Sequence, residues 1–166
     1  FDSTDPNYAQ HALTGDLKKT VVIVSSKSGS TIETSAQRSL FQAAFTAAGL
    51  NPIEHILFVT DPGSPLDSEV RDAGFSVINA DPNVGGRFSV LSAFGLTPTA
   101  LAGAPIEQLL QDAQSEKSEF LTHPQTILDT AYLLVARASQ YIAFTDAGSA
   151  VPGLSDWIEQ LIAEST

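Results

Sequence analysis

A loop rich in hydroxyl groups has the composition of an anion-binding site. It reads Ser25-Ser26-Lys27-Ser28-Gly29-Ser30-Thr31 and joins an apolar strand pattern to a helical pattern. The first N–H groups of a helix have no partner within the helix, and the helix dipole places partial positive charge there, so this junction favours a phosphate. The same composition also suits an ordinary capped loop, because Ser and Thr are common helix caps.

A second loop places an arginine directly after two glycines. It reads Asn83-Val84-Gly85-Gly86-Arg87-Phe88-Ser89. Adjacent glycines let the backbone approach a ligand closely, and an arginine just before a helix start that we expect to be buried has little reason to be there for packing. A lone loop arginine is commonly solvated or paired with a carboxylate. Here it lies two strands away from the first loop, which makes it a candidate cation for the same ligand.

The elements around these loops alternate between strand and helix patterns. Strands are predicted at 20–26, 56–60, 75–79 and 141–144. Helices are predicted at 32–48, with a capping box of Ser30 and Glu33, and at 65–73, 88–96, 106–120, 127–139 and 154–163. The helix at 127–139 is expected to pack its apolar residues inward: Leu128, Ala131, Tyr132, Leu134, Val135 and Ala138.

This alternation predicts an α/β fold, a three-layer αβα sandwich with a mainly parallel sheet of the Rossmann-like or flavodoxin-like kind. In such sheets ligands bind beyond the carboxyl ends of the strands. Both polar loops leave from those ends, so we expect them to face one ligand.

Composition excludes several classes of partner and chemistry. The 166 residues are 43% hydrophobic, as in one compact domain, and 19 acidic against 8 basic residues give a net charge of −11. The basic residues are scattered, so nucleic acid is not an expected partner. No apolar run approaches the roughly 20 residues of a membrane span, and we expect a soluble, cytoplasmic protein with no membrane partner. With no cysteine, the chain has no disulfide, thiolate metal site or catalytic thiol.

Taken in order, the two loops resemble those of the phosphoglucose isomerase (glucose-6-phosphate isomerase) family. Residues 26–34 are similar to the family's S-K-[TS]-x-x-T-x-E-T phosphate loop, and residues 83–92 to its x-V-G-G-R-[FY]-S-x-x-S loop. Residues 159–165 are similar to the stretch that precedes the family's E-S-x-G-K segment. The resemblance covers nearly the whole chain and implies one sugar isomerase (SIS) domain over residues 1–166, a fragment of a longer isomerase.

The resemblance also implies roles for individual residues. Ser26, Lys27, Ser28 and Thr31 match the residues that bind the sugar phosphate. Gly86 is then a substrate-binding residue beside Arg87, whose guanidinium stabilises the enediolate, and Glu164 is the base that moves a proton between C2 and C1. A glutamate at this position would otherwise be an ordinary exposed helix residue.

The implied reaction is the reversible isomerisation of glucose 6-phosphate and fructose 6-phosphate, in glycolysis and gluconeogenesis. It needs no metal and no cofactor, and the parent enzyme is expected to be a homodimer. Other parts of the family's site, including the ring-opening histidine, are expected outside residues 1–166. The fragment by itself is therefore expected to be inactive.

Two other functions fit parts of the pattern. A non-catalytic sugar-phosphate-binding SIS module or regulator would keep the Ser-rich loop, but it has no need of Arg87 or of a base. A nicotinamide dehydrogenase domain would need a G-x-G-x-x-G turn after the first strand, and residues 28–31 do not form one. Arg87 is thus the residue that separates an isomerase from a binding module.

Overall fold

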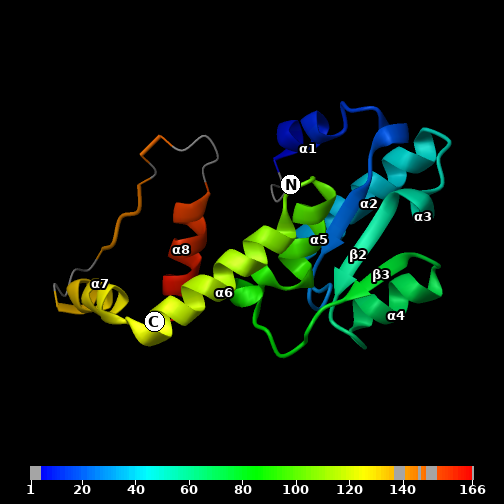
Figure 1. Cartoon of the computed structure of the whole chain (residues 1–166). Helices are drawn as coiled ribbons and strands as arrows, with labels where there is room; N and C mark the ends of the chain where they lie inside the picture. The colour runs from blue at the N-terminus through cyan, green and yellow to red at the C-terminus, as the bar shows by residue number, and fades with distance from the viewer. Residues whose placement is uncertain (1–4, 137–140, 146, 149–152, 166) are drawn as a thin grey trace. The chain divides into compact units, whose positions relative to one another are not determined.

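The computed structural model describes residues 5–136, 141–145, 147–148 and 153–165 (Figure 1). The chain divides into two units, Phe1–Ala102 and Gly103–Thr166. The first unit holds the sheet and both polar loops, and the second consists of helices and connecting segments. Among the described residues, no helix is both long enough and apolar enough to cross a membrane.

A parallel sheet of order β1-β2-β3 forms the centre of the first unit. Its strands are β1 (Val22–Ser25), β2 (Ile56–Thr60) and β3 (Ser76–Asn79). Val24 lies opposite Phe58, which lies opposite Val77 in turn. The parallel sheet is confirmed, and β2 has the predicted bounds. β1 is shorter than predicted because its pairing begins at Val22 opposite Ile56, the first residue of β2, which leaves Val21 outside the ladder and 59% exposed.

Helices precede and follow the strands in the first unit: α1 (Pro6–Ala12), η1 (Leu17–Lys19), α2 (Ile32–Ala47), α3 (Pro52–His55), α4 (Pro65–Asp72), η2 (Gly86–Leu91) and α5 (Ala93–Leu101). The second unit contains α6 (Ile106–Thr122), α7 (Gln125–Ala136) and α8 (Leu154–Ala163). Local side-chain chemistry determines where several of these helices begin, as α4 shows. At α4, the Ser64 hydroxyl accepts a hydrogen bond from the Asp67 N–H at 3.0 Å, and Pro65 occupies the first turn.

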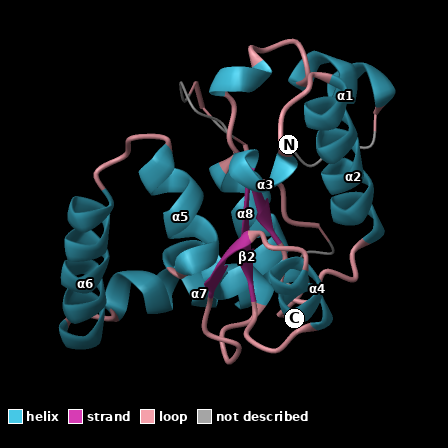
Figure 2. Cartoon of the chain, turned by 90° about the vertical axis from the view of Figure 1, so that its right-hand side faces the viewer, coloured by secondary structure: helices cyan, strands magenta, loops and turns pink. Residues whose placement is uncertain are grey.

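The two faces of the sheet are covered by different helices. On one face, side chains of α2 and α4 pack with β1 and β2 around Phe58, which is completely buried together with Phe45. On the other face, Phe94 of α5 packs against Val59 and Ala80. Figure 2 shows α5 on one side of the strands and α2 and α4 on the other. This arrangement is the predicted α/β sandwich of three layers.

Some expected local features are wrong. The Ser30–Glu33 capping box does not form: Thr31 is the N-cap of α2 without a side-chain cap bond, and the Ser30 hydroxyl is hydrogen-bonded to that of Ser28 at 2.6 Å. Residues 88–91 belong to the short 3₁₀ helix η2, and Phe88 is 55% exposed where a buried start was expected. Residues 141–144 have no strand partner in the described structure.

The apolar side of α7 is also not buried as predicted. Leu128, Ala131, Tyr132, Leu134 and Val135 are all exposed, while Ala138 lies outside the described residues. The helical spacing of these residues is correct, but the described part of the chain places no core against them. A periodic apolar pattern predicts a face, whereas burial depends on a neighbouring element.

Candidate functional site

The first polar loop spans the gap between the carboxyl end of β1 and the first turn of α2. The Ser26 N–H donates to the Val59 carbonyl at 3.0 Å, which ties the start of the loop to β2. Within the loop, the Gly29 N–H donates to the Ser26 hydroxyl at 3.1 Å and the Ser30 N–H to the Ser28 hydroxyl at 3.2 Å. Backbone donors and hydroxyl groups are therefore concentrated at the start of a 16-residue helix. Helix N-termini are common phosphate-binding positions, and the role of this loop as a phosphate site stays a prediction.

Gly29 lets the loop lie directly on α4. Its φ angle is +77°, and a Cβ atom added there would lie 2.6 Å from the Leu66 Cβ atom. Leu66 is a buried residue of the core beneath the loop. A larger residue at position 29 would be strained in its backbone and would push the loop off this support.

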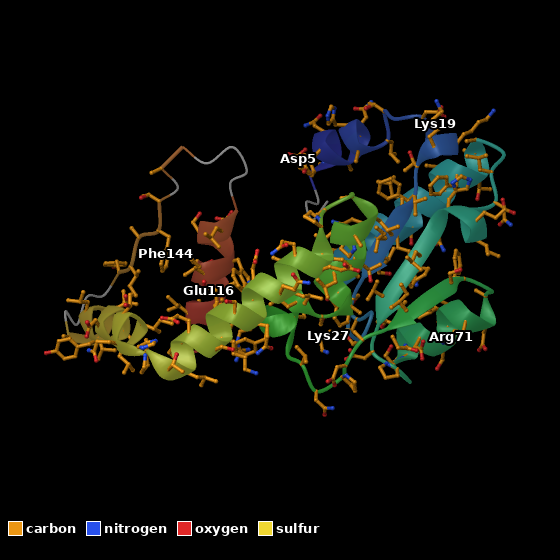
Figure 3. All side chains as sticks on the ribbon, in the orientation of Figure 1. Asp5, Lys19, Lys27, Arg71, Glu116 and Phe144 are labelled. Atoms are coloured by element: carbon orange, nitrogen blue, oxygen red, sulfur yellow. The ribbon has the colours of Figure 1, made fainter. Side chains whose placement is uncertain are left out.

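Lys27 points its ammonium group toward the end of the neighbouring strand. Its Nζ atom lies 2.9 Å from Oδ1 of Asp61, the residue that follows β2, and 5.3 Å from the ring centroid of Phe94. Figure 3 shows Lys27 at the end of the sheet toward which the strand arrows point. The chain therefore brings a cation to the carboxyl edge, as predicted, and pairs it with a carboxylate that was not predicted.

The second polar loop lies in the same unit and connects to the first through α5. Gly86 and Arg87 begin η2, and the Arg87 guanidinium carbon lies 4.7 Å from the ring centroid of Phe88. η2 packs closely on α5, which supplies the Phe94 ring beside Lys27. The structure thus links Arg87 to Lys27 through η2, α5 and Phe94.

A glycine makes the close packing of η2 on α5 possible. A Cβ atom built on Gly95 would overlap with the backbone carbonyl of Val90, so no side chain fits at this position. Two hydroxyl bonds hold the same turn: the Ser89 hydroxyl donates to the Gly86 carbonyl at 2.6 Å, and the Ser92 hydroxyl to the Ser89 carbonyl at 2.7 Å. The position of Arg87 therefore depends on short-range backbone geometry in this segment.

A polar network at the carboxyl edge was not identified from the sequence. Asp67, which is 8% exposed, accepts hydrogen bonds from the Gly63 N–H at 2.9 Å, from Arg71 at 2.7 Å and from Asn79 at 3.1 Å. The Gly63 bond, followed by Asn79 and Arg71, holds the pKa of the Asp67 carboxyl below its ordinary value of 3.8. The network fixes the turn after β2 to the end of β3.

Glu164 belongs to the second unit. It is the C-cap residue of α8, it is exposed, and its side chain accepts a hydrogen bond from Gln160 at 3.2 Å. The predicted bounds of the helix that precedes it are confirmed. The role of Glu164 as a base stays a prediction, and so do the binding roles of Ser26, Lys27, Ser28, Thr31 and Gly86 and the catalytic role of Arg87.

A cavity of about 460 Å³ lies along β1 and α2. Thr31 of the predicted phosphate loop lines it, together with Ser25 and Arg38. In the part of the chain that the structure describes, no three His, Asp or Glu side chains come together in a way that could hold a metal ion.

The sequence carries a signal for the position of Asp61 but not for the contacts of Asp67. Asp61 directly follows the apolar run of β2, and the carboxyl ends of adjacent parallel strands lie side by side. Position alone therefore brings Asp61 close to the loop that follows β1. Asp67 lies three residues after the cap Ser64, but nothing in the pattern shows that Asn79 would reach it.

Comparison with known proteins gives several relatives that are named glucose-6-phosphate isomerase. The chain is 33% identical over 151 residues to a glucose-6-phosphate isomerase of Campylobacter jejuni. The matched region covers 90% of this chain and 37% of that protein. A hypothetical protein of Thermus thermophilus has a solved structure with a TM-score of 0.67 and 37% identity over 72% of this chain and 30% of its own. A glucose-6-phosphate isomerase structure from Chlamydia trachomatis matches with a TM-score of 0.51 and 40% identity over 56% of this chain and 18% of its own.

No model of a known protein family matches the sequence. The chain spans about a third of the length of the first curated relatives that it matches.

Proposed function

Because this chain belongs to the glucose-6-phosphate isomerase family, we propose that it is the sugar-phosphate-binding SIS domain of an enzyme that interconverts glucose 6-phosphate and fructose 6-phosphate. The observation that carries the proposal is the match to glucose-6-phosphate isomerases over 90% of the chain. The hydroxyl-rich loop at the start of α2 supports it, because Ser and Thr hydroxyl groups beside a helix N-terminus can donate hydrogen bonds to a phosphate.

In this proposal the first loop anchors the substrate by its phosphate. The hydroxyl groups of Ser26, Ser28 and Thr31 donate hydrogen bonds to the phosphate, and Lys27 supplies a positive charge. The Ser26 and Ser28 hydroxyl oxygens meanwhile accept bonds from the Gly29 and Ser30 N–H groups, which hold the loop in shape. The phosphate is remote from the reacting carbons. Its binding energy orients C1 and C2 for reaction, so the loop contributes to the rate through position.

Arg87 and Glu164 then perform the chemistry. Glu164 removes the C2 proton and returns it to C1, and negative charge develops on the enediolate oxygens. Arg87, next to Gly86 at the start of η2, stabilises that charge. A non-catalytic module would need neither residue, and the relatives from Campylobacter jejuni and Chlamydia trachomatis are named glucose-6-phosphate isomerases.

A glutamine substitution in the full-length protein tests the proposal. Glu164→Gln keeps the size and shape of the side chain and removes the base. We expect isomerisation and the exchange of the C2 proton with solvent deuterium to be lost together, while sugar-phosphate binding remains. Undiminished exchange in this variant would assign the base to another residue, and no isomerisation by the unsubstituted protein would refute the function itself.

A further inference from the structure

Lys27 of the proposed phosphate loop already has an anionic partner. Its ammonium lies 2.9 Å from the Asp61 carboxylate, and the Lys27 and Asp61 side chains are only 30% and 18% exposed. A charge that is removed from water to this extent is costly unless it is paired. Asp61 therefore satisfies Lys27 when the loop holds no anion.

The backbone keeps these two residues together. The Lys27 carbonyl accepts hydrogen bonds from the Asp61 N–H at 3.2 Å and from the Thr60 hydroxyl at 2.8 Å. Thr60 is completely buried, so this connection lies within the folded core. The Lys27–Asp61 ion pair is thus a consequence of how the first polar loop is hydrogen-bonded to the end of β2.

One side of the ammonium also faces an aromatic ring. Phe94, which is 9% exposed, places its ring centroid 5.3 Å from the Lys27 Nζ atom. Asp61 and Phe94 together direct the ammonium from two elements. An ammonium group has several N–H donors, so it can keep a bond to Asp61 and donate to a second anion.

We propose that Asp61 is the internal counter-ion of Lys27 and sets the affinity of the loop for phosphate. A phosphate bound at residues 26–31 shares the ammonium with Asp61, whose negative charge offsets part of the attraction between the ammonium and the phosphate. Asp61 therefore orients Lys27 and, at the same time, weakens phosphate binding so that the anion is readily released. This inference rests on the proposed function, which places the phosphate at this loop.

Asparagine at position 61 separates the two effects. Asp61→Asn keeps an oxygen that can accept the Lys27 bond and removes the negative charge. We expect the 166-residue chain carrying Asp61→Asn to bind inorganic phosphate about threefold to tenfold more tightly than the unsubstituted chain, with a steeper loss of affinity on adding salt. Affinities are measured by titration with phosphate, following the amide NMR signals of residues 26–31.

A second variant shows whether the effect passes through Lys27. In the Lys27→Met background, Asp61→Asn should change phosphate affinity by less than the single substitution does, because the shared ammonium is gone. The control is Glu69→Gln, which removes a carboxylate from an ion pair of the same 2.9 Å length with Arg38. Glu69→Gln makes the same change in net charge and should leave the affinity unaltered.

The outcomes distinguish this inference from the function on which it rests. Equal or weaker phosphate binding by Asp61→Asn would overturn the counter-ion role alone. An equal gain from Glu69→Gln, or a full gain without Lys27, would also overturn it, since net charge would then explain the result. Failure of both the unsubstituted chain and Asp61→Asn to bind phosphate at residues 26–31 would refute the phosphate site itself.

A measurement without substitution at Asp61 covers the case in which that variant does not fold. In the unsubstituted chain, the ¹⁵N signal of the Lys27 ammonium should be visible through its bond to Asp61 and should move when phosphate is added. Glucose without phosphate should leave it in place. A Lys27 signal that phosphate does not move would overturn the inference.

Discussion

Three cations of the first unit have different expected roles. Lys27 and Arg87 lie in the two loops of the candidate site, whereas Arg71 is bonded to Asp67 and Asn79. Residue type alone does not separate these roles, but each role predicts its own response to substitution.

Arg87 should matter more for turnover than for stability. In the full-length protein we expect Arg87→Ala to lower kcat by roughly 10²-fold or more, comparable to the loss of an oxyanion donor, with little change in Tm. Arg71→Ala is the matched control: it removes a network arginine and should lower Tm while leaving kcat nearly unchanged. Normal turnover with a collapsed Tm in Arg87→Ala would make that arginine structural.

Asp67 should make stability depend on pH in the acidic range. Its pKa is lower in the folded chain than the 3.8 of an ordinary aspartate, chiefly because the Gly63 N–H bonds to the charged form. The stabilisation is therefore complete above the unfolded pKa and is lost as the pH falls through the folded value. We expect Asp67→Asn to lower Tm near neutral pH and to match the unsubstituted chain at the most acidic pH.

The control for this pH dependence is Asp72→Asn, which changes an exposed aspartate on the same helix. It should leave the pH profile of Tm unaltered. A constant Tm difference between Asp67→Asn and the unsubstituted chain at every pH would show that the charge of Asp67 is not what stabilises the turn.

Among the elements, η2 and α5 determine where Arg87 lies. Gly95→Ala places a methyl group against the Val90 carbonyl, so we expect a loss of about 1–3 kcal/mol in the free energy of unfolding, together with a loss of activity. Gly86→Ala meets no atom within 4 Å and should change stability by no more than about 0.5 kcal/mol. Because Gly86 is proposed to contact substrate, its variant should still lose affinity for the sugar phosphate. Equal stability of the two variants would contradict this account of the turn.

The helices and strands also show which structural features the sequence patterns could predict. β2 was predictable to the residue because it is a continuous apolar run bounded by Asp61-Pro62-Gly63. The N-cap residue of α2 was not predictable, because Ser30 and Thr31 are both residue types that often cap helices. The hydrogen bond between the Ser28 and Ser30 hydroxyls decides between them. The position of the first polar loop at a strand end was predictable from the strand and helix patterns, while the roles of its residues stay predictions. The pairing of Asp61 with Lys27 is recognised only once the strands are placed side by side.

At the scale of the whole chain, the larger cluster of buried apolar residues lies in the first unit, beneath the first polar loop. Phe58 is completely buried between β1, α2 and α4. We expect Phe58→Ala to lower the free energy of unfolding by about 3–5 kcal/mol in denaturant titration. Ile32→Ala, at a residue that is 76% exposed, should change it by no more than about 0.5 kcal/mol. Similar losses in both variants would mean that the core is not organised as described.

The proposed function requires that the loop between β1 and α2 recognises a phosphorylated sugar. The most direct test is a titration of the 166-residue chain with glucose 6-phosphate and, separately, with glucose, followed by amide NMR. Glucose 6-phosphate should shift the signals of residues 26–31, and glucose at the same concentration should not, because the loop is proposed to bind the phosphate group of the sugar. Shifts confined to other residues, or equal shifts with both sugars, would contradict the claim.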